Sequence, residues 1–354
     1  MTLGAVAAAQ DASGGVVGYV INARDGTPIA FADIYLMEQR RPAFANADGR
    51  FRYAGLDTGR VTIRVRRMGF SPATIPATSR PGRTDTVRVR LDPVAIALAD
   101  VRTRDVVCPN RATQRVDTAV ITVLQQVRLN AERSALFADE FPFEATMERT
   151  IANEWDAPNI SKRISRQVLL VDTITLTGRS DWQYEPGHLL TSVSDPRVKD
   201  VKDKLLIPTL ADFADDAFQG SHCFSFQGLA TMAGQRLVRV DFEPTRDVRG
   251  VDVSGSLYLD PRTYEIRQST LTLERPSPQA IKDIWMVRVD TWFGSAAPFL
   301  PVVDSIVQRT TVREAASGRR PSDGRSASET QRRIRLRFLD REPRDTSDIP
   351  RLRD

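Results

Sequence analysis

Histidine and cysteine are the first side chains to test for a zinc site or a nucleophile in this 354-residue chain. The two histidines are His188 and His222, and His222 precedes Cys223. A peptidase zinc needs histidines, a carboxylate and a general base, but Leu-Leu-Thr follows His188, without the His-x-x-Glu spacing of a zinc peptidase. Neighbouring strand residues point to opposite faces, so His222 and Cys223 are poorly placed for a thiol–imidazole pair. We expect no metal site and no cysteine nucleophile.

Serine and phosphate chemistry also lacks its signatures. The chain contains neither Gly-x-Ser-x-Gly, which presents a nucleophilic serine, nor a glycine-rich phosphate loop. Carboxylates are plentiful, for example Asp139, Glu140, Asp215 and Asp216, but such residues usually lie on solvated helix or loop faces. We therefore expect no catalytic residue and no cofactor. A hydrolase or peptidase accessory whose carboxylates meet only in the folded chain stays open as an alternative.

A calcium loop in FANADGRFRYAG fails on its spacing. If Gly49 were the turn glycine of a helix–loop–helix calcium site, ligand positions would fall on Phe44, Asn46 and Asp48, and the closing glutamate on Gly55. Neither Phe44 nor Gly55 has a side-chain oxygen. We expect Asp48-Gly49 to form a hairpin turn instead, because glycine adopts positive φ without strain.

The elements before residue 104 are short β segments. Turns recur about every 8 to 12 residues, which predicts a small antiparallel β-sandwich over residues 15–103. In the segment from Val61 to Arg66, apolar residues alternate with polar ones, so Arg64 and Arg66 should face solvent. Residues 104–116 lack a period and are interpreted as a linker.

Residues 117–342 read as a second domain of the α+β class. Asp117 can cap a long helix, and strand patterns follow it. One helix face collects apolar residues at three- and four-residue spacing: Val120, Val123, Leu124, Val127 and Ala131. The segment LLIPTLADFADDAF predicts a shorter helix with Pro208 near its first turn. A large curved antiparallel sheet would then need the long helix, or a lipid, over its apolar face.

Three further segments are expected to connect the strands or to end the chain. LDPRTYE, residues 259–265, predicts a hairpin connection at Asp260-Pro261. Residues 315–329 are rich in Ser, Gly and Arg, which predicts a mobile loop between the last two strands. Residues 343–354 are expected to form a disordered tail.

The N-terminal residues 1–14 are interpreted as the remnant of a signal peptide, with a disordered tail as the alternative. Ala7-Ala8-Ala9 fits the small-x-small pattern of signal-peptidase cleavage. Export to the periplasm or cell envelope of a Gram-negative-type bacterium follows from that interpretation. In such an oxidising compartment the two cysteines, Cys108 and Cys223, would form a disulfide.

Charge and hydropathy argue against nucleic-acid binding and against a membrane-spanning helix. Only five of the 50 basic residues are lysine, and the positive side chains do not form a stripe with interleaved aromatics. No apolar run approaches the roughly 20 residues of a membrane-spanning helix. We expect no nucleic-acid partner and no transmembrane helix, and the sequence predicts no oligomeric state.

A series of glycines and aromatics gives the first domain a family resemblance. Gly-Val-Val-Gly-Tyr, Asp-Gly-Thr-Pro, Ala-Asp-Gly-Arg-Phe and Arg-Met-Gly-Phe occur in order. Together they resemble the carboxypeptidase regulatory-like domain, a transthyretin-like β-sandwich without catalytic activity. The resemblance implies structural roles for Gly18, Gly26, Asp48, Gly49, Phe51, Gly59 and Gly69. Phe51 should fill the sandwich core, and Gly59 should allow a chain reversal.

The second domain resembles bacterial envelope proteins similar to LolA-like lipoprotein carriers. The resemblance rests on the sequence pattern G-x-L-x-L-D-x-x-T-x-x-I, which runs from Gly255 to Ile266. It implies a curved sheet with a helix across its mouth and an acyl-chain ligand, but no ligand-binding residue. We therefore expect an exported, non-enzymatic binding or scaffold protein. Its partner would be a lipid, in an apolar groove of the second domain, or another envelope protein. A carbohydrate- or protein-binding sandwich is the further alternative, and would need an exposed aromatic.

Overall fold

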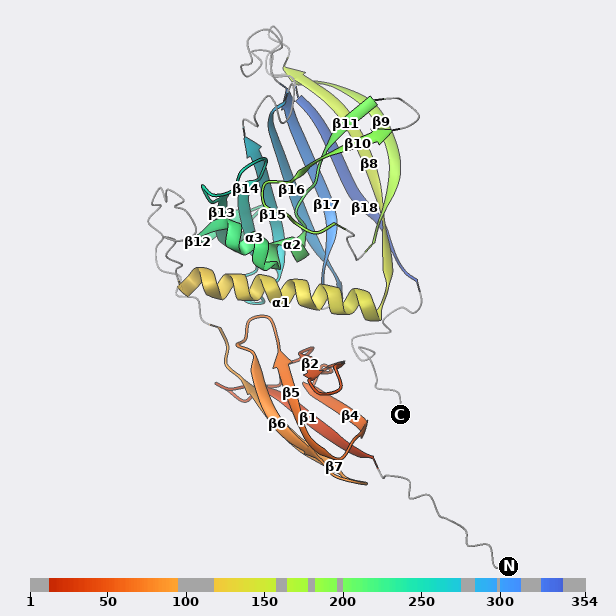
Figure 1. The fold of residues 1–354 in the computed structure, drawn as a ribbon, viewed down its shortest axis with the longest axis vertical. Helices are drawn as coiled ribbons and strands as arrows, with labels where there is room; N and C mark the ends of the chain where they lie inside the picture. Colours follow the sequence, from red (N-terminus) through yellow and green to blue (C-terminus); the bar gives the residue numbers. More distant parts are fainter. Residues whose placement is uncertain are drawn as a thin grey trace, which may run out of the picture. The chain divides into compact units, whose positions relative to one another are not determined.

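The computed structural model describes residues 13–94, 118–156, 164–177, 182–195, 200–274, 284–297, 300–312 and 326–339. The chain forms two compact units, residues 1–95 with 343–354 and residues 96–342. The class is mainly β with one long helix, as the sequence predicts (Figure 1). The expected linker and both expected tails lie outside the described residues, apart from Ser13 and Gly14.

The N-terminal unit consists of two facing sheets. The first sheet has the order β4-β1-β7 and the second the order β3-β2-β5-β6. The strands are β1 (Gly14–Asn22), β2 (Asp33–Leu36), β3 (Arg41–Phe44), β4 (Arg50–Leu56), β5 (Gly59–Arg66), β6 (Ala73–Ser79) and β7 (Thr84–Leu91). Strands β1 and β7 pair in parallel, whereas the sequence predicted an antiparallel sandwich.

The sandwich core forms because apolar residues alternate along every strand. Val61, Ile63 and Val65 of β5 are at most 5% exposed, whereas Arg64 is exposed. Phe51 is 2% exposed and packs directly on Gly18, where a Cβ would come within 2.0 Å of the phenyl ring. The glycine and the phenylalanine therefore require each other.

The hairpin expected at Asp48-Gly49 is wrong. Gly49 does adopt a positive φ of 70°, but the strands on either side, β3 and β4, belong to different sheets. The turn therefore carries the chain across the sandwich. Gly59 (φ 140°) lies where the chain crosses back from β4 to β5, while Gly26 and Gly69 adopt positive φ in loops.

The C-terminal unit is built on one nine-stranded antiparallel sheet of order β12-β13-β14-β15-β16-β17-β18-β8-β9. Its strands are β8 (Phe143–Asp156), β9 (Ile164–Thr177), β12 (His222–Met232), β13 (Gln235–Pro244), β14 (Ser254–Leu259), β15 (Ile266–Glu274), β16 (Ile284–Ala297), β17 (Leu300–Val312) and β18 (Ser326–Phe338). A separate hairpin pairs β10 (Leu190–Asp195) with β11 (Asp200–Leu205). Residues 326–329 of the loop expected over 315–329 belong to β18, and the rest of that segment lies outside the described residues.

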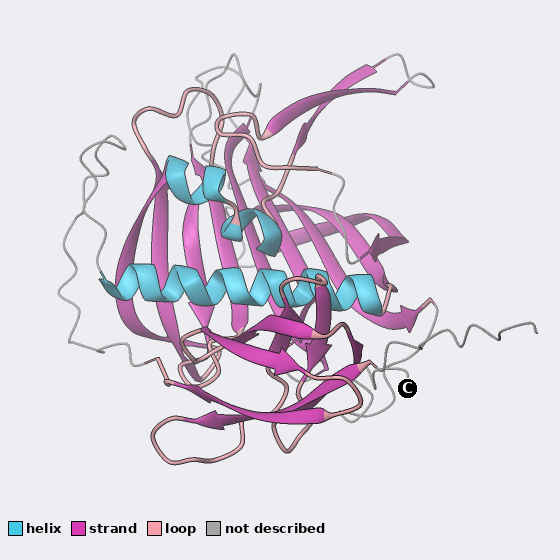
Figure 2. Ribbon diagram, turned by 60° about the horizontal axis from the view of Figure 1, so that its bottom comes forward, coloured by secondary structure: helices cyan, strands magenta, loops and turns pink. Residues whose placement is uncertain are grey.

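Within the described ranges, three helices accompany the sheet: α1 (Thr118–Glu140), α2 (Leu210–Ala214) and α3 (Asp216–Ser221). Figure 2 shows α1 crossing the strands on the side where α2 and α3 also lie. Val120, Val123 and Val127 are fully buried, as the helical spacing predicts, whereas Leu124 is half-buried. No helix in the described ranges is long and apolar enough to span a membrane.

The short helix expected around LLIPTLADFADDAF is two helices. Asp215 has an extended backbone, and its side chain accepts a hydrogen bond from the Ala217 amide at 2.6 Å. An N-capping aspartate of this kind begins a new helix. The break turns the phenyl rings of Phe213 and Phe218 onto Phe242 of β13, at centroid distances of 6.0 and 5.4 Å.

Residue alternation assigns the two faces of the nine-stranded sheet. Val240, Leu257, Leu271 and Val289 are cross-strand neighbours on the face that α2 and α3 cover, here called the helix-covered face. Gln268 and Trp292 are register partners an odd number of residues from Leu271 and Val289, so they lie on the opposite face. The two faces carry different cavities.

Candidate ligand-binding site

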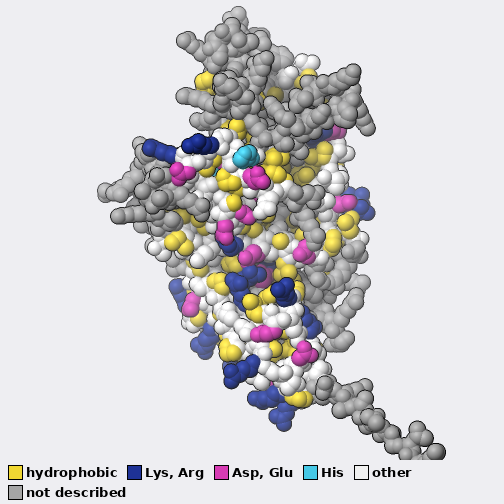
Figure 3. All heavy atoms as spheres, in the orientation of Figure 1, with side chains coloured by type: hydrophobic (Ala, Val, Ile, Leu, Met, Phe, Trp, Pro, Cys, Tyr) yellow, Lys and Arg dark blue, Asp and Glu magenta, His cyan; other side chains and the backbone are white. Residues whose placement is uncertain are grey.

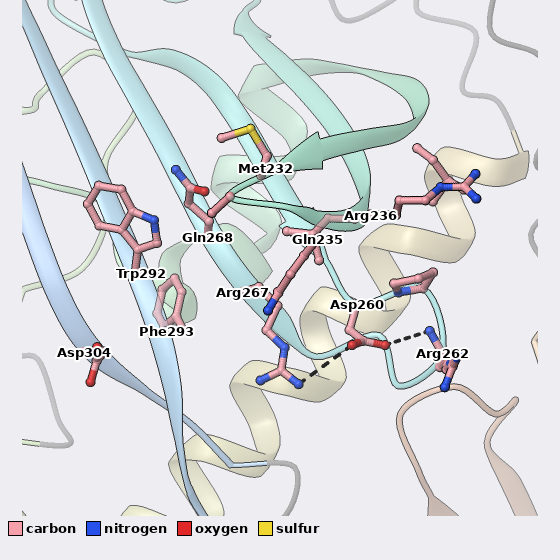
Figure 4. A pocket seen from close by; sticks show the side chains of 14 residues that line it. Met232, Gln235, Arg236, Asp260, Arg262, Arg267, Gln268, Trp292, Phe293 and Asp304 are labelled. Carbon is pink, nitrogen blue, oxygen red and sulfur yellow. Dashed lines mark hydrogen bonds and ion pairs between the residues drawn. The ribbon is translucent and has the colours of Figure 1, made fainter.

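An open cavity of about 780 Å³ lies on the opposite face of the sheet (Figure 4). A volume of this size is within the roughly 300–1,000 Å³ range of small-molecule sites. Its wall comes from the β12–β13 hairpin, the β14–β15 turn and the strands β15 to β17. The lining residues are Leu229, Met232, Ala233, Gln235, Arg236, Leu237, Asp260, Pro261, Arg262, Arg267, Gln268, Trp292, Phe293 and Asp304.

Register shifts in neighbouring strands shape this cavity. Between β14 and β15 the shift leaves Arg267 as an extra residue, and between β16 and β17 it leaves Asp304. Both extra residues line the cavity. A bulge re-aims side chains, which is why Trp292 and Phe293, adjacent in sequence, reach the same cavity. Bulges of this kind are common beside functional sites.

The β12–β13 hairpin forms one rim through a tight turn. Met232 pairs with Gln235, and the two residues between them, Ala233 and Gly234, have φ values of 47° and 79°. Two successive positive φ values are the signature of the hairpin turn that matches strand twist. This turn brings Met232 and Gln235 to the cavity.

The β14–β15 turn forms another rim, at the position that the sequence predicts. The carboxylate of Asp260 accepts hydrogen bonds from the backbone amides of Arg262 and Thr263, at 2.8 and 3.0 Å. Arg267 donates to Glu265 at 2.7 Å and lies 3.9 Å from Asp260. The acidic side chains therefore hold the turn and Arg267 in place.

Asn130 of α1 anchors this turn from inside the unit. Its side-chain amide donates to the Tyr264 carbonyl at 2.8 Å and accepts from the Ile266 amide at 3.1 Å. Asn130 is fully buried and Tyr264 has a positive φ of 55°. The helical pattern of the sequence gave no signal for this contact, because a polar residue on α1 would normally face solvent.

Two arginines on the rim have their charges available. Within the described residues, neither Arg236 nor Arg262 makes a side-chain ion pair, and both are exposed. In Figure 4 the rings of Trp292 and Phe293 stand on one side of the cavity and Arg262 on the other. The cavity thus combines an aromatic wall with guanidinium groups that can bind carboxylate or phosphate.

The helix-covered face contains a much smaller cavity, of about 10 Å³. Every residue around it is aliphatic or proline: Leu205, Leu206, Ile207, Pro208, Val253, Leu271, Leu273, Val287 and Val289. That volume is roughly one water molecule. None of the residues around either cavity comes from α1, so the groove expected beneath that helix stays a prediction.

A buried polar network joins the edge of the sheet to the segment before β10. Tyr184 donates to Asp252 at 2.7 Å, and the Gly187 amide donates to the same carboxylate oxygen at 2.9 Å. The His222 Nε2 atom lies 3.5 Å from Asp252 Oδ1, and its Nδ1 atom lies 3.2 Å from Ser221 Oγ. Serine, histidine and aspartate thus meet, a constellation that no sequence spacing revealed.

The side chains of this network are buried and hydrogen-bonded to one another, which stabilises the edge of the sheet. His222 is fully buried and stacks on Phe218 at a centroid distance of 4.0 Å. Its two ring nitrogens lie 3.0 and 3.1 Å from the carbonyl oxygens of Phe218 and Val253, and the fully buried ring is closed to a substrate. Burial acts to raise the pKa of Asp252, but hydrogen bonds from His222, Tyr184 and Gly187 together lower it.

Of the four carboxylates considered from the sequence, Asp139, Asp215 and Asp216 do not converge on one site, and the side chain of Glu140 lies outside the described residues. Asp215 caps α3, Asp216 binds Arg128 at 2.6 Å, and Asp139 is exposed at the end of α1. Among the described residues, each carboxylate with a clearly displaced pKa has it lowered: Asp25, Glu38, Asp172, Asp216 and Asp252. General acid catalysis at neutral pH needs a raised one.

The structure bears on the histidines and cysteines considered from the sequence. In the part of the chain that the structure describes, no cluster of His, Cys, Asp or Glu could hold a metal ion. His188 is exposed, and its Nδ1 atom lies 3.0 Å from the Pro186 carbonyl. Cys223 is 8% exposed and is part of a disulfide. Cys108 lies outside the described residues, so its pairing with Cys223 stays a prediction.

Comparison with solved structures gives only remote likenesses for the chain. A LolA superfamily protein from Nitrosomonas europaea is 10% identical, with a TM-score of 0.25 over 60% of this chain and 95% of that one. An outer-membrane lipoprotein-sorting type of domain from Vibrio parahaemolyticus is 13% identical, with a TM-score of 0.30 over 61% and 97%. A minor pilin from Streptococcus agalactiae is 16% identical, with a TM-score of 0.22 over 26% and 49%, so this chain spans about half of it.

With TM-scores this low, none of these structures supports an argument about ligand or activity. No curated protein matches the chain. The comparison of sequence families is firmer for the N-terminal unit, where the resemblance drawn from the glycines is confirmed. Residues 15–92 match the family model of the carboxypeptidase regulatory-like domain.

Proposed function

We propose that this protein is a non-enzymatic binding module of the bacterial envelope. Its C-terminal unit binds an amphiphilic anion, an apolar group that carries a carboxylate or phosphate, in the 780 Å³ cavity. The observation that carries the proposal is the cavity itself, in which bulged strands bring Trp292 and Phe293 opposite the guanidinium group of Arg262.

The lining matches both halves of such a ligand. Trp292, Phe293 and Met232 offer an apolar wall, against which an aliphatic or aromatic group loses water-exposed surface. Arg236 and Arg262 offer guanidinium groups without an acidic partner in the described residues. A charge-assisted hydrogen bond to an anion is about twice as strong as a neutral one.

The same lining argues against catalysis. It contains no histidine, cysteine, serine or lysine, and both of its carboxylates are engaged. Asp260 binds turn amides, and Asp304 accepts a hydrogen bond from Arg333 at 2.9 Å. A general base would need its lone pairs directed at a substrate. A hydrolase accessory with a hidden carboxylate pair is therefore the weaker candidate.

Export is supported by chemistry at Cys223. Its disulfide would persist in an oxidising compartment, which agrees with the signal-peptide interpretation of the first residues. Membership of the envelope also agrees with the LolA-like resemblance of the second domain.

Two measurements test the proposal. Protein expressed in a bacterial periplasm should carry a co-purifying amphiphile that mass spectrometry detects after organic extraction. The protein freed of it should bind laurate, a simple fatty-acid anion, in isothermal titration calorimetry. Absence of laurate binding to the correctly folded chain would overturn the proposal for this ligand class.

A matched pair of variants locates the site. Arg236→Ala with Arg262→Ala should weaken laurate binding about tenfold or more, because charged hydrogen bonds contribute roughly 1.5–3 kcal/mol each. Arg246→Ala with Arg249→Ala removes the same charge from exposed residues outside the cavity lining and should change the affinity less than about twofold. Equal losses in both pairs would show that net charge, not the cavity, attracts the ligand.

A further inference from the structure

The solvent-facing side of the three-stranded sheet in the N-terminal unit places one tyrosine between two arginines. Tyr19 of β1 is the register partner of Arg50 on β4 and of Arg88 on β7. Its side chain is 37% exposed, and both arginines are exposed. Neighbouring strands lie about 4.8 Å apart, so the two arginines stand roughly 10 Å apart with the ring between them.

Two more arginines lengthen this arrangement into a diagonal stripe. Arg52 and Arg90 follow Arg50 and Arg88 at two-residue spacing and therefore share the same face. Each step of two residues adds about 6.7 Å along a strand. We call Tyr19 with Arg50, Arg52, Arg88 and Arg90 the arginine face. Figure 3 shows dark-blue Lys and Arg side chains standing out over the N-terminal unit.

Negative charge is missing from the outward positions of these three strands. Those positions carry Val17, Tyr19 and Ile21 on β1, Arg50, Arg52 and Ala54 on β4, and Thr84, Thr86, Arg88 and Arg90 on β7. Within the described residues, Arg50, Arg88 and Arg90 make no ion pair. These three arginines of the arginine face therefore carry positive charge without an acidic partner in the described part of the chain.

The sheet fixes the backbone positions from which the arginine face projects. The inward side chains beneath it, Val16, Val20, Phe51, Tyr53 and Val89, are each at most 2% exposed and belong to one core cluster. The hydroxyl of Tyr53 donates to the Arg41 carbonyl at 3.0 Å and ties the two sheets together. Ligand binding therefore has to order side chains but not the backbone that carries them.

We propose that the arginine face binds an acidic polysaccharide. Guanidinium groups bind carboxylate or sulfate through paired hydrogen bonds, and a linear polyanion can contact several in sequence. Tyr19 offers an exposed ring face at the centre of the stripe for a sugar ring. This site is separate from the cavity in the C-terminal unit. Tyr19 is the exposed aromatic residue that a carbohydrate-binding sandwich would need.

The composition of the face favours a polysaccharide over a lipid surface or single-stranded nucleic acid. Peripheral membrane sites combine basic residues with large apolar side chains that insert. In the described part of the N-terminal unit, Tyr19 and Met37 are the exposed large hydrophobic residues, and Met37 follows β2 of the other sheet. Proteins that bind single strands stack successive bases on several aromatics, whereas the arginine face has one ring.

The test uses the full chain and polygalacturonate, a carboxylated polysaccharide, as the probe in calorimetry at low salt. Arg50→Ala with Arg88→Ala should weaken binding about tenfold or more, and Tyr19→Ala should weaken it further than Tyr19→Phe. The control Arg60→Ala with Arg64→Ala removes equal charge from exposed positions on β5 of the other sheet. It should change the affinity less than about twofold.

Three results would overturn the proposal. The first is absence of binding to polygalacturonate by the folded wild-type chain. The second is an equal loss in the Arg60 and Arg64 control. The third is tighter binding to anionic phosphatidylglycerol vesicles or to single-stranded DNA than to polygalacturonate. Unchanged melting temperatures in all variants, expected because every replaced side chain is exposed, would exclude unfolding as the cause of any loss.

Discussion

The two faces of the nine-stranded sheet use the same strands for opposite purposes. On the helix-covered face, aliphatic residues close around a space of about 10 Å³, and the His222–Asp252 network is buried beside α3. On the opposite face, register shifts open a cavity of about 780 Å³ with aromatic and arginine side chains. The first face stabilises the unit and the second is available for a ligand.

This difference teaches that polar residues alone do not mark a functional site. The buried network contains serine, histidine and aspartate within hydrogen-bond reach, yet its histidine nitrogens face carbonyl oxygens. The opposite-face cavity lacks such a constellation but has open volume and uncompensated charge. Accessibility and available hydrogen-bonding capacity therefore separate the two.

The largest effect should come from the helix-covered face. Asp252→Ala should lower the free energy of unfolding by about 3–5 kcal/mol, because it leaves buried donors of Tyr184, Gly187 and His222 without their carboxylate. Urea denaturation measures this. Glu185→Ala, an exposed carboxylate of the same segment, should cost less than about 0.5 kcal/mol. Similar costs for both would contradict the structural role.

The same carboxylate should give the protein a pH dependence. Its pKa is lowered in the folded protein, so its contribution is present above the unfolded pKa of about 4 and is lost as pH falls through the folded value. Unfolding free energy measured between pH 7 and pH 2 should therefore fall at the acid end. The fall should be shallower in Asp252→Asn, and an unchanged slope would count against an ionised Asp252.

A pair of neighbours on β15 compares the faces directly. Leu271→Ala should cost about 2–5 kcal/mol, because Leu271 is 2% exposed and its loss enlarges the aliphatic cavity. Thr272, the next residue, points to the opposite face and is half-buried, so Thr272→Ala should cost less than about 1 kcal/mol. Thermal unfolding of both variants measures the contrast, and equal costs would show that the faces are misassigned.

Asn130 links the two faces and should affect both stability and binding. Asn130→Ala should cost about 1–3 kcal/mol, because the Tyr264 carbonyl and Ile266 amide lose a buried partner. The freed turn carries Arg262, so laurate affinity should fall as well. Gln125→Ala, an exposed change on the same helix, is the control. Loss of stability with unchanged affinity would uncouple the turn from the site.

Local patterns predicted the elements but not the site. Alternation identified the strands, the spacing of Val120, Val123 and Val127 identified α1, and Asp260-Pro261 identified the hairpin turn. The site depends on bulges, which a period of two cannot reveal. The arrangement of Arg267, Trp292 and Phe293 around one cavity follows from those bulges.

Contacts across long sequence separations were likewise beyond the sequence. His222 meets Asp252 and Tyr184 only through the fold, and Asn130 meets a turn more than 130 residues away. In the N-terminal unit, the glycines predicted the sandwich, but they did not show that Asp48-Gly49 crosses between sheets. Pairing between strands is decided by the assembled core and not by the turn alone.

The most direct test of the central claim is contact between the ligand and Trp292. A bromine-labelled fatty acid quenches the fluorescence of a tryptophan that it touches, and Trp292 is one of four tryptophans in the chain. The account predicts quenching in the wild type and in a variant with Trp155, Trp182 and Trp285 changed to Phe. Quenching should disappear in Trp292→Phe while calorimetry still shows laurate binding. Quenching that persists in Trp292→Phe would place the ligand elsewhere and contradict the account.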